Sequence, residues 1–531
     1  MATPGLALGP RSMERPSDAG HTLVGTLDDT APARVDRAGG VQADGAAWSI
    51  DWWIGGDDRW YFPCREATVR QQRLGAGPLI ATSVRIPSGD AVQRCYPVSI
   101  GGRSATVVEI ENDSPVPVAL ALAVRPYTLD GSPSHGSVNI DDRRIMVGDQ
   151  VALCLPRRAN ERLATNRDAS DVVSTGSSLS GAAEVAGETP NGVVLYPLPH
   201  RTKLRFVVPA VGGGTIHPDE VPDLEAVQRG WTAVVDGGGR FSFPDNGITQ
   251  RASGARARLL IGTREVPSAV ATLEPGAGRW LAGLAASGNE RDVRMALLAL
   301  ASAFPARLPS SPGAAAAIVG AAGTGLAMMD DRDLADDVLG VLVQITHLVE
   351  RAGDRSAAGE ALRGLGWALV AADQPDPARE LLARSIPLGV GRDLVAGLDD
   401  LTVLGEQGSA AGSWHDDDPV DAARFWLGAR GLVLTEDVDG VDLLPGFPTA
   451  WRGGGVEVHG AATVHGRVSF AVRWHGYRPA LLWDVEAHRP FRLRCSGLDA
   501  GWSTIESKGE VLLEGAADEL PAPPSEGDSF L

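Results

Sequence analysis

The chain has little cysteine and no long apolar run. Among its 531 residues are only four cysteines, and none stands in a CxxC pair or beside a histidine cluster. This argues against a disulfide-stapled fold and a zinc finger, and it predicts reduced, buried thiols. No stretch approaches the roughly 20 apolar residues that cross a bilayer, and residues 1–45 lack the charged start and apolar segment of a secretion signal. We therefore expect a cytoplasmic protein without a membrane anchor.

An excess of basic residues is also missing. The 48 Lys and Arg stand against 67 Asp and Glu, so the formal net charge is -19. Such a surface repels phosphate backbones and anionic lipids, which argues against nucleic acid and membranes as partners. A neutral ligand is compatible with it, although soluble proteins that bind nothing charged are often as acidic.

The sequence carries no cofactor or metal signature. Gly320, Gly323 and Gly325 neither follow a predicted strand nor spell GxGxxG, so a nucleotide-binding fingerprint is rejected. The histidines between residues 459 and 475 lack the spacing of metal ligands and are interpreted as surface or turn residues. We expect no cofactor and no metal.

Changes in hydrophobic periodicity divide the chain into domains. From Trp48 to about Leu260, short apolar runs alternate with turn signals, which predicts an all-β sandwich. From about Pro267 the apolar residues recur at three- and four-residue steps, which predicts antiparallel helical hairpins. After Glu436 the period returns to two, which predicts a small β-module. The predicted domains are a flexible tail or edge extension (1–45), a β-sandwich (46–264), a helical-hairpin domain forming a partial α/α toroid (265–436), a C-terminal β-module (437–515) and an acidic tail (516–531).

Individual elements follow from the same patterns. Asp376 and Asp418 each precede a proline, which is typical of an N-cap followed by a first helical turn. Residues 160–190 are polar and predict a long loop. The clearest strands are 106–111, 116–124, 192–196 and 204–208, and helices are expected at 291–303, 314–329, 333–351, 356–372, 377–385 and 419–434.

A run of acids precedes the last predicted helix, where residues 414–419 read WHDDDP. The helix dipole stabilises anions there, and mutual repulsion between neighbouring acids can raise one pKa toward the range of a general acid. Asp416 or Asp417 is therefore a candidate catalytic carboxyl, and Glu406 is its candidate partner. The plainer alternative is an N-cap at Asp418 with solvated loop acids beside it.

Other residues near this run complete the candidate site. Trp414 and His415 are candidate substrate-binding residues because they directly precede the acids. Four further acids are weaker candidates, each better explained as a surface charge on a polar helix face: Glu350, Glu360, Asp399 and Asp400.

Tryptophan is unusually frequent, with thirteen residues against five tyrosines. Trp52 and Trp53 stand close in sequence to Asp57 and Arg59. Flat rings flanked by an acid and a guanidinium can hold a sugar by stacking on its C–H face, so these four are candidate substrate-binding residues. The alternative is that the rings fill the sandwich core or a seam between domains.

Two stretches resemble the six-hairpin glycosidases, which include glucoamylase-like hydrolases, maltose-type phosphorylases, rhamnosidases and fucosidases. One is Val69 to Pro97, similar to the sandwich strands that precede such barrels. The other is Trp414 to Trp451, where a late helix leads through the turn LLPGFPTAW into a small β-region. A full ring of twelve helices needs about 300 residues, whereas residues 267–436 provide roughly 170, so about half a ring fits. The acid-bearing signature of the family's mid-barrel loop is missing, so no catalytic residue is transferred.

The resemblance implies a protein whose partner is carbohydrate. Our first hypothesis is a hydrolase of an intracellular glucan or related glycoside, with an inverting pair of carboxyls roughly 6.5 to 9.5 Å apart. The second is a catalytically degenerate relative that binds sugar or acts as a scaffold. The sugar, the linkage and the oligomeric state stay open.

Overall fold

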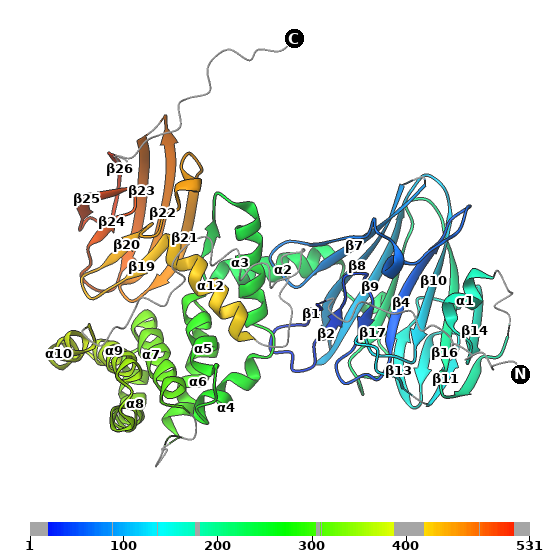
Figure 1. Ribbon diagram of the computed structural model, residues 1–531, viewed down its shortest axis with the longest axis horizontal. Coiled ribbons are helices and arrows are strands. Elements are labelled where there is room, and N and C mark those ends of the chain that lie inside the picture. Colours follow the sequence, from blue (N-terminus) through cyan, green and yellow to red (C-terminus); the bar gives the residue numbers. More distant parts are fainter. Residues whose placement is uncertain are drawn as a thin grey trace, which may run out of the picture. The chain divides into compact units, whose positions relative to one another are not determined.

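A computed structural model describes residues 20–87, 89–134, 136–175, 181–303, 308, 311–386, 419–476 and 478–514. They fall into two compact units, each described by itself (Figure 1). Unit 1 comprises the described chain up to Ala233 together with Ser253–Arg264, and unit 2 comprises Val234–Ala252 and the described residues after Arg264, apart from Pro419. Several predicted residues lie outside the described residues, and their roles stay predictions: Asp399, Asp400, Glu406, Trp414, His415, Asp416, Asp417 and the N-cap Asp418.

Unit 1 is a β-sandwich of two antiparallel sheets, as predicted. The first sheet has the order β1-β2-β3-β4-β10-β16-β14, with β5 paired to β4: β1 (Thr22–Val24), β2 (Ala33–Val35), β3 (Val41–Gln42), β4 (Ser49–Gly55), β5 (Trp60–Tyr61), β10 (Val118–Arg125), β14 (Glu161–Thr165) and β16 (Asn191–Leu198). The second has the order β15-β11-β12-β13-β17-β9-β8-β7-β6: β6 (Arg70–Arg73), β7 (Ile80–Ile86), β8 (Gly89–Ile100), β9 (Arg103–Asp113), β11 (Gly136–Ile140), β12 (Arg144–Val147), β13 (Gln150–Cys154), β15 (Glu184–Gly187) and β17 (Lys203–Pro209).

Alternation along β4 sends its two tryptophans to opposite faces of the first sheet. Trp52 pairs in register with Leu122 of β10, and both lie in the cluster between the two sheets. Trp53 lies in a second cluster on the other face, where α1 (Ala169–Ser174) contributes Val172 and Val173. Both faces of the first sheet are therefore covered around β4.

The four cysteines lie within the described residues, and none forms a disulfide. Cys95, Cys154 and Cys495 are buried, as predicted, whereas Cys64 is half-buried. Burial raises the pKa of the Cys495 thiol to about 12, so this sulfur stays protonated and unreactive.

Several predictions for unit 1 need correction. Residues 20–45 are better described by the edge-extension alternative than by a flexible tail, because β1, β2 and β3 lengthen the first sheet and bury Val24, Val35 and Val41. The long loop predicted at 160–190 is wrong, since the segment contains β14, α1 and β15. The all-β assignment up to Leu260 is also wrong, because α2 (Leu224–Gly237) and α3 (Asn246–Leu259) follow the sandwich.

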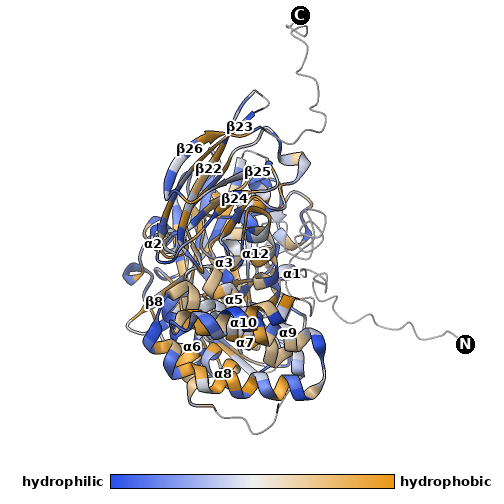
Figure 2. Cartoon of the chain, turned by 90° about the vertical axis from the view of Figure 1, so that its left-hand side faces the viewer, coloured by the Kyte–Doolittle hydropathy of each residue, from blue (hydrophilic) through white to orange (hydrophobic). Residues whose placement is uncertain are grey.

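The described helices of unit 2 from Glu290 onward begin and end within two residues of the predicted ranges, whereas those at Val266–Ala271 and Ala277–Ala286 match no individually predicted range. The helices pack in two layers: α7 lies beside α5 and α9 in one, and α6 lies beside α4 and α8 in the other. In Figure 2, α8 shows both blue and orange residues along its length, as an amphipathic helix does. The helices are α4 (Val266–Ala271), α5 (Ala277–Ala286), α6 (Glu290–Ala301), α7 (Pro312–Met329), α8 (Arg332–Ala352), α9 (Arg355–Ala371), α10 (Pro375–Ser385) and α12 (Pro419–Val433).

Glycines let α7 and α9 approach backbone to backbone. A Cβ added at Gly323 would overlap the carbonyl oxygen of Gly364, and one added at Gly364 would overlap that of Val319. The glycines of α7 thus have a packing role. By length and composition alone α7 could cross a bilayer, but 61% of it is buried inside the unit, as in the core helix of a soluble protein.

Helix starts follow local capping. The Asp354 side chain accepts a hydrogen bond from the Ala357 N–H and begins α9, and Asp331 does the same for α8 at Leu334. The N-cap predicted at Asp376 is wrong: α10 begins two residues earlier, after Gln374, and Asp376 lies in its first turn.

The C-terminal β-module of unit 2 contains two sheets, which confirms the predicted third part of the architecture. Strand β18, which precedes the central helices in sequence, pairs with β21, so the module takes in residues from two distant segments. The five-stranded sheet is β18 (Arg240–Ser242), β21 (Val456–Thr463), β22 (Gly466–His475), β23 (Arg478–Ala487) and β26 (Lys508–Leu512), and the four-stranded sheet is β19 (Leu434–Glu436), β20 (Val441–Leu443), β24 (Leu493–Cys495) and β25 (Asp499–Thr504).

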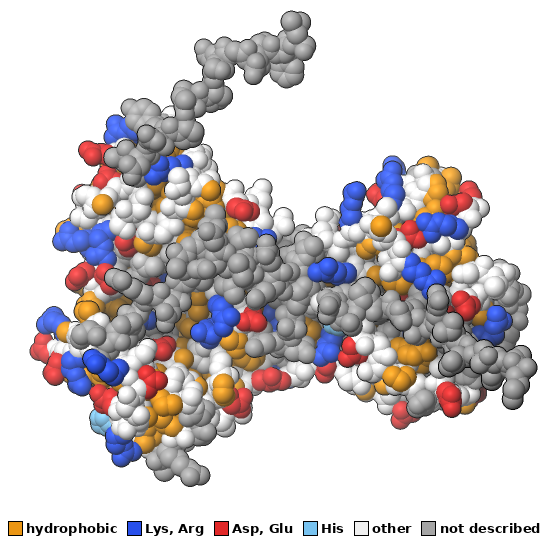
Figure 3. All heavy atoms as spheres, in the orientation of Figure 1, with side chains coloured by type: hydrophobic (Ala, Val, Ile, Leu, Met, Phe, Trp, Pro, Cys, Tyr) orange, Lys and Arg blue, Asp and Glu red, His pale blue; other side chains and the backbone are white. Residues whose placement is uncertain are grey.

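The surface mixes charges of both signs. On the face drawn in Figure 3, acidic and basic side chains are interspersed over the coloured parts of both units, with hydrophobic side chains between them. The net charge of -19 is therefore not gathered into one acidic patch on that face.

Candidate functional site

The tryptophans predicted to hold a sugar are buried in unit 1. Trp52 and Trp53 are each 1% exposed. The Trp52 indole N–H donates to the Ala38 carbonyl at 2.9 Å, and the Trp53 ring packs against Phe62 with centroids 5.1 Å apart. A sugar needs an exposed ring face, so the predicted stacking role is wrong and the core alternative is confirmed.

Asp57 and Arg59, predicted to accompany these rings, lie at the surface. Arg59 donates to the Glu66 carboxylate at 2.5 Å, and its guanidinium stands 3.9 Å over the Tyr61 ring. With Trp52 and Trp53 in the core, the four residues do not form one ligand surface.

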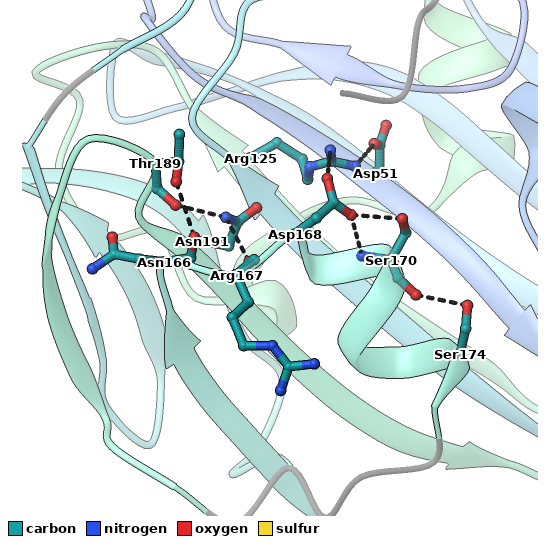
Figure 4. Close-up of polar contacts among 9 residues, drawn as sticks. All are labelled: Asp51, Arg125, Asn166, Arg167, Asp168, Ser170, Ser174, Thr189 and Asn191. Atoms are coloured by element: carbon teal, nitrogen blue, oxygen red, sulfur yellow. Dashed lines mark hydrogen bonds and ion pairs between the residues drawn. The ribbon is translucent and has the colours of Figure 1, made fainter. Parts of the chain in front are cut away.

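A buried charge cluster in unit 1 joins Asp51, Arg125 and Asp168 (Figure 4). Arg125, at the end of β10, points between two carboxylates: it donates to Asp51 at 3.3 Å and to Asp168 at 3.0 Å. Asp168 also accepts the backbone N–H and the hydroxyl of Ser170, at 2.8 and 2.6 Å. The central guanidinium carbon also lies over two aromatic rings, 5.8 Å from the Trp53 centroid and 5.9 Å from that of Tyr127.

This cluster holds α1 against the first sheet. Burial alone would raise the pKa of Asp168, but Arg125 and the hydrogen bonds from Ser170 outweigh it, so the pKa lies below its ordinary value of 3.8. Asp168 is also the N-cap of α1. Each charge is committed to a protein partner, so we assign the cluster a structural role.

A second polar cluster lies in unit 2, between α9, α12 and the β-module. The Arg430 guanidinium of α12 donates to Glu436 of β19 at 2.7 Å and to the Ala462 carbonyl at 2.7 Å. His465, in the turn before β22, places Nε2 2.8 Å from the Asp437 carbonyl oxygen. Glu360 and Arg363 project from α9. The carboxylates of Glu360 and Glu436 both favour the charged form of the Arg363 guanidinium. We call Glu360, Arg363, Arg430, Glu436 and His465 the unit 2 cluster.

Within the described part of the chain, four polar atoms of the unit 2 cluster are buried without a hydrogen bond to protein. They are Arg363 Nε, Arg430 Nε, Glu436 Oε2 and His465 Nδ1. Among the described residues Arg363 makes no hydrogen bond or ion pair, and burial lowers the pKa of its guanidinium. Buried polar groups in folded proteins are almost always partnered, so this concentration needs a physical explanation.

The surroundings of the unit 2 cluster suit a ligand. The Trp367 ring lies one turn beyond Arg363 on α9 and meets the His465 ring edge-on, with centroids 6.3 Å apart. Gly320 of α7 leaves room beside Glu360, since a Cβ there would lie 3.2 Å from the glutamate's Cγ. Glu360 and Arg363 are half-buried, so the cluster reaches solvent on the α9 side.

A cavity of about 730 Å³ runs along α8, lined by the weaker candidate Glu350 and by His347 among others. Its described lining residues all belong to that one helix, and Glu350 is paired to Arg384 at 3.2 Å. The surface-charge alternative therefore suits Glu350. In the described parts of the chain, no group of three or more His, Cys, Asp or Glu residues is placed to hold a metal ion.

Sequence reasoning underrated the unit 2 cluster. Glu360 was the one member treated as a candidate acid. A usable signal was present, because Arg363 and Arg430 stand inside otherwise apolar helix faces, as in the segment FWLGARGLVL. Arg430 donates to Glu436, six residues on, and to the Ala462 carbonyl, 32 residues on, and no local spacing reveals the second contact.

Comparisons with known proteins give no family assignment. No protein-family model and no curated protein matches the chain. Among solved structures, a bacterial glucoamylase complexed with acarbose aligns at a TM-score of 0.47 and 11% identity, over 74% of this chain and 69% of the glucoamylase. A family GH92 α-mannosidase from Bacteroides thetaiotaomicron in complex with mannoimidazole aligns at a TM-score of 0.30 and 8% identity, over 75% and 65% of the two chains. Neither alignment gives a residue of this chain a role.

Proposed function

We propose that this is a carbohydrate-active protein that binds a sugar in unit 2, at Glu360, Arg363, Arg430, Glu436 and His465. The observation that carries the proposal is the set of buried guanidinium, carboxylate and imidazole atoms that make no hydrogen bond to protein. A sugar presents hydroxyls that both donate and accept, so one ligand can partner Arg363 Nε, Glu436 Oε2 and His465 Nδ1 together.

Trp367 gives the site its apolar side. Sugar-binding sites combine an aromatic or aliphatic wall with a few placed polar groups, which fix orientation. A neutral ligand is favoured because the cluster already contains both signs of charge: Glu360 and Glu436 against Arg363 and Arg430.

A more specific version of this proposal is that the protein hydrolyses a glycoside. It rests on the sequence, which places Asp416 or Asp417 and Glu406 as an inverting pair acting on an intracellular glucan or related glycoside. Within the described residues, Glu436 is held in an ion pair with Arg430, so it serves as a ligand-orienting carboxylate rather than as a proton donor. Sugar binding without turnover is the second candidate, and the short helical stretch favours it.

The test is a panel of neutral mono- and oligosaccharides, screened on the full chain for heat of binding and for release of new reducing ends. We expect binding by at least one sugar, weakened about tenfold or more by Glu360→Gln, since one charge-assisted hydrogen bond contributes about that factor. Glu380→Gln on the exposed face of α10 is the matched control.

The outcomes separate the two forms. Binding with product release supports a hydrolase, and binding without it supports the degenerate form. If Glu360→Gln leaves the affinity for the sugar unchanged, the sugar binds elsewhere in the molecule. No response to any sugar contradicts the proposal in both forms.

A further inference from the structure

A cavity in unit 1 is lined by three arginines. It measures about 640 Å³ and lies at the tip of the β11–β12 hairpin, beside β14 and the segment after β17. Arg143, Arg144 and Arg162 line it, together with Asp141, Asp142 and Thr215. No residue of the unit 2 cluster is among its described lining residues.

Each arginine is anchored through one side of its guanidinium. Arg143 Nη1 donates to the Pro156 carbonyl at 2.8 Å and lies 2.8 Å from His217 Nε2. Arg144 uses Nε for Asp141 at 2.8 Å and Nη1 for Thr215 at 3.2 Å. Arg162 Nη1 donates to Asp142 at 3.0 Å and to the Ile140 carbonyl at 3.3 Å.

The second terminal nitrogen of each arginine, Nη2, is not used to anchor the side chain. Among the described residues, Nη2 of Arg143, Arg144 and Arg162 makes no hydrogen bond, and Arg143 has no carboxylate within ion-pair distance. The guanidiniums are therefore held in fixed orientations while one donor pair of each stays available. Such preorganised forks are the usual means of binding an oxyanion.

The aspartates of the cavity do not cancel this charge. The Asp141 carboxylate already accepts hydrogen bonds within the hairpin, from the backbone N–H groups of Arg143 and Arg144 and from the Arg144 side chain. Burial would raise the pKa of Asp141, but these hydrogen bonds outweigh burial and lower it. Asp142 is shared between Arg162 and Arg158, at 3.0 and 3.6 Å. Four arginines thus meet two carboxylates, in a chain whose net charge is -19.

We propose that this cavity binds a phosphate-sized oxyanion, carried free or as the charged group of a small metabolite. Arg143, Arg144 and Arg162 each supply a fork to it, and Thr215 offers a hydroxyl beside Arg144. The proposal is independent of sugar binding in unit 2, because the two sites share no residue.

Titration calorimetry on the full chain at constant ionic strength tests it, with inorganic phosphate as the probe and sodium chloride as the background salt. We expect saturable phosphate binding that Arg143→Gln and Arg162→Gln each weaken about tenfold, the loss of one charge-assisted contact. The control is Arg85→Gln, since Arg85 is exposed on another hairpin of unit 1 and is paired to Asp90. Its phosphate affinity should equal that of the unaltered chain.

A second arm identifies the source of the oxyanion. Glucose 6-phosphate that binds more tightly than phosphate points to a phosphorylated metabolite, and equal affinity points to the free ion. Unfolding temperatures of all variants check that unit 1 is folded. No phosphate binding, or equal binding by the three variants, overturns the proposal.

Discussion

The two buried charge clusters of this protein differ in how completely protein atoms satisfy them. In unit 1, Arg125 meets two carboxylates and two aromatic faces, and Asp168 also accepts two hydrogen bonds from Ser170. Within the described residues, the Nε of Arg125 is the one buried polar atom of this cluster that lacks a hydrogen bond. In the unit 2 cluster, four buried polar atoms make no hydrogen bond within the described residues, and Arg363 makes none through any of its side-chain atoms.

The difference separates a structural cluster from a binding one. A completed cluster stabilises the fold that surrounds it, so breaking it costs stability. An incomplete one weakens the fold and is retained where a ligand completes it. The two clusters should therefore respond in opposite ways when their central arginine is replaced by an apolar residue of similar length.

Arg125→Met should have the largest effect. It leaves the carboxylates of Asp51 and Asp168 buried beside each other without a cation, and we expect unfolding to become easier by about 3 to 4 kcal/mol. Urea unfolding at neutral pH measures this, with Arg85→Met as the exposed control expected to change by less than about 0.5 kcal/mol. A loss below about 1 kcal/mol for Arg125→Met would show that the ion pairs are not structural.

Asp168→Asn should cost less, about 2 kcal/mol at neutral pH, because the amide oxygen can still cap α1 while the charge-assisted bond to Arg125 is lost. The folded-state pKa of Asp168 lies below the ordinary 3.8, so its stabilisation is complete above that value and is lost as the pH falls below it. The gap in unfolding free energy between the two proteins should close on going from pH 5 to pH 2. A gap that stays constant would contradict the pKa shift.

Periodicity predicted much of the fold for identifiable reasons. In α8 the buried Leu334, Val338, Val341 and Ile345 recur on one face, so its bounds were predicted within a residue. Helix α3 was missed because alanine and arginine, for example Ala255 and Arg256, fill most of its buried positions between Ile248 and Leu259, so no apolar stripe shows in the sequence. Strands β1 to β3 have two or three residues each, too few to show alternation.

The candidate sites were harder to predict than the elements. Composition drew attention to Trp52 and Trp53, yet alternation on β4 buries one on each face of the sheet. The unit 2 cluster joins α9, α12, β19 and the turn before β22, and only tertiary packing brings these together.

Asp418→Ala tests the start of α12, the helix that carries Arg430 into the unit 2 cluster. The structure begins α12 at Pro419, where the sequence predicts Asp418 as the N-cap. We expect a loss of about 1 kcal/mol in the free energy of unfolding, measured by thermal or urea denaturation. Unchanged melting would mean that another residue caps this helix.

The Asp416→Asn, Asp417→Asn double variant should have the smallest effect on stability, near zero, because neither acid is the predicted cap. If the protein hydrolyses a glycoside, turnover should vanish in this variant while sugar binding in unit 2 persists. Product release at the unaltered rate would remove both acids from the catalytic assignment.

The most direct test of the central claim replaces Arg363 by methionine and follows stability and sugar binding together, with Arg355→Met on the exposed start of the same helix as the control. Removal of a buried cation without a protein partner should leave the unfolding free energy unchanged or raise it by about 1 kcal/mol, while the sugar-induced rise in melting temperature disappears. Arg355→Met should keep both properties. Arg363→Met that unfolds more easily and still responds to sugar in full would contradict the account.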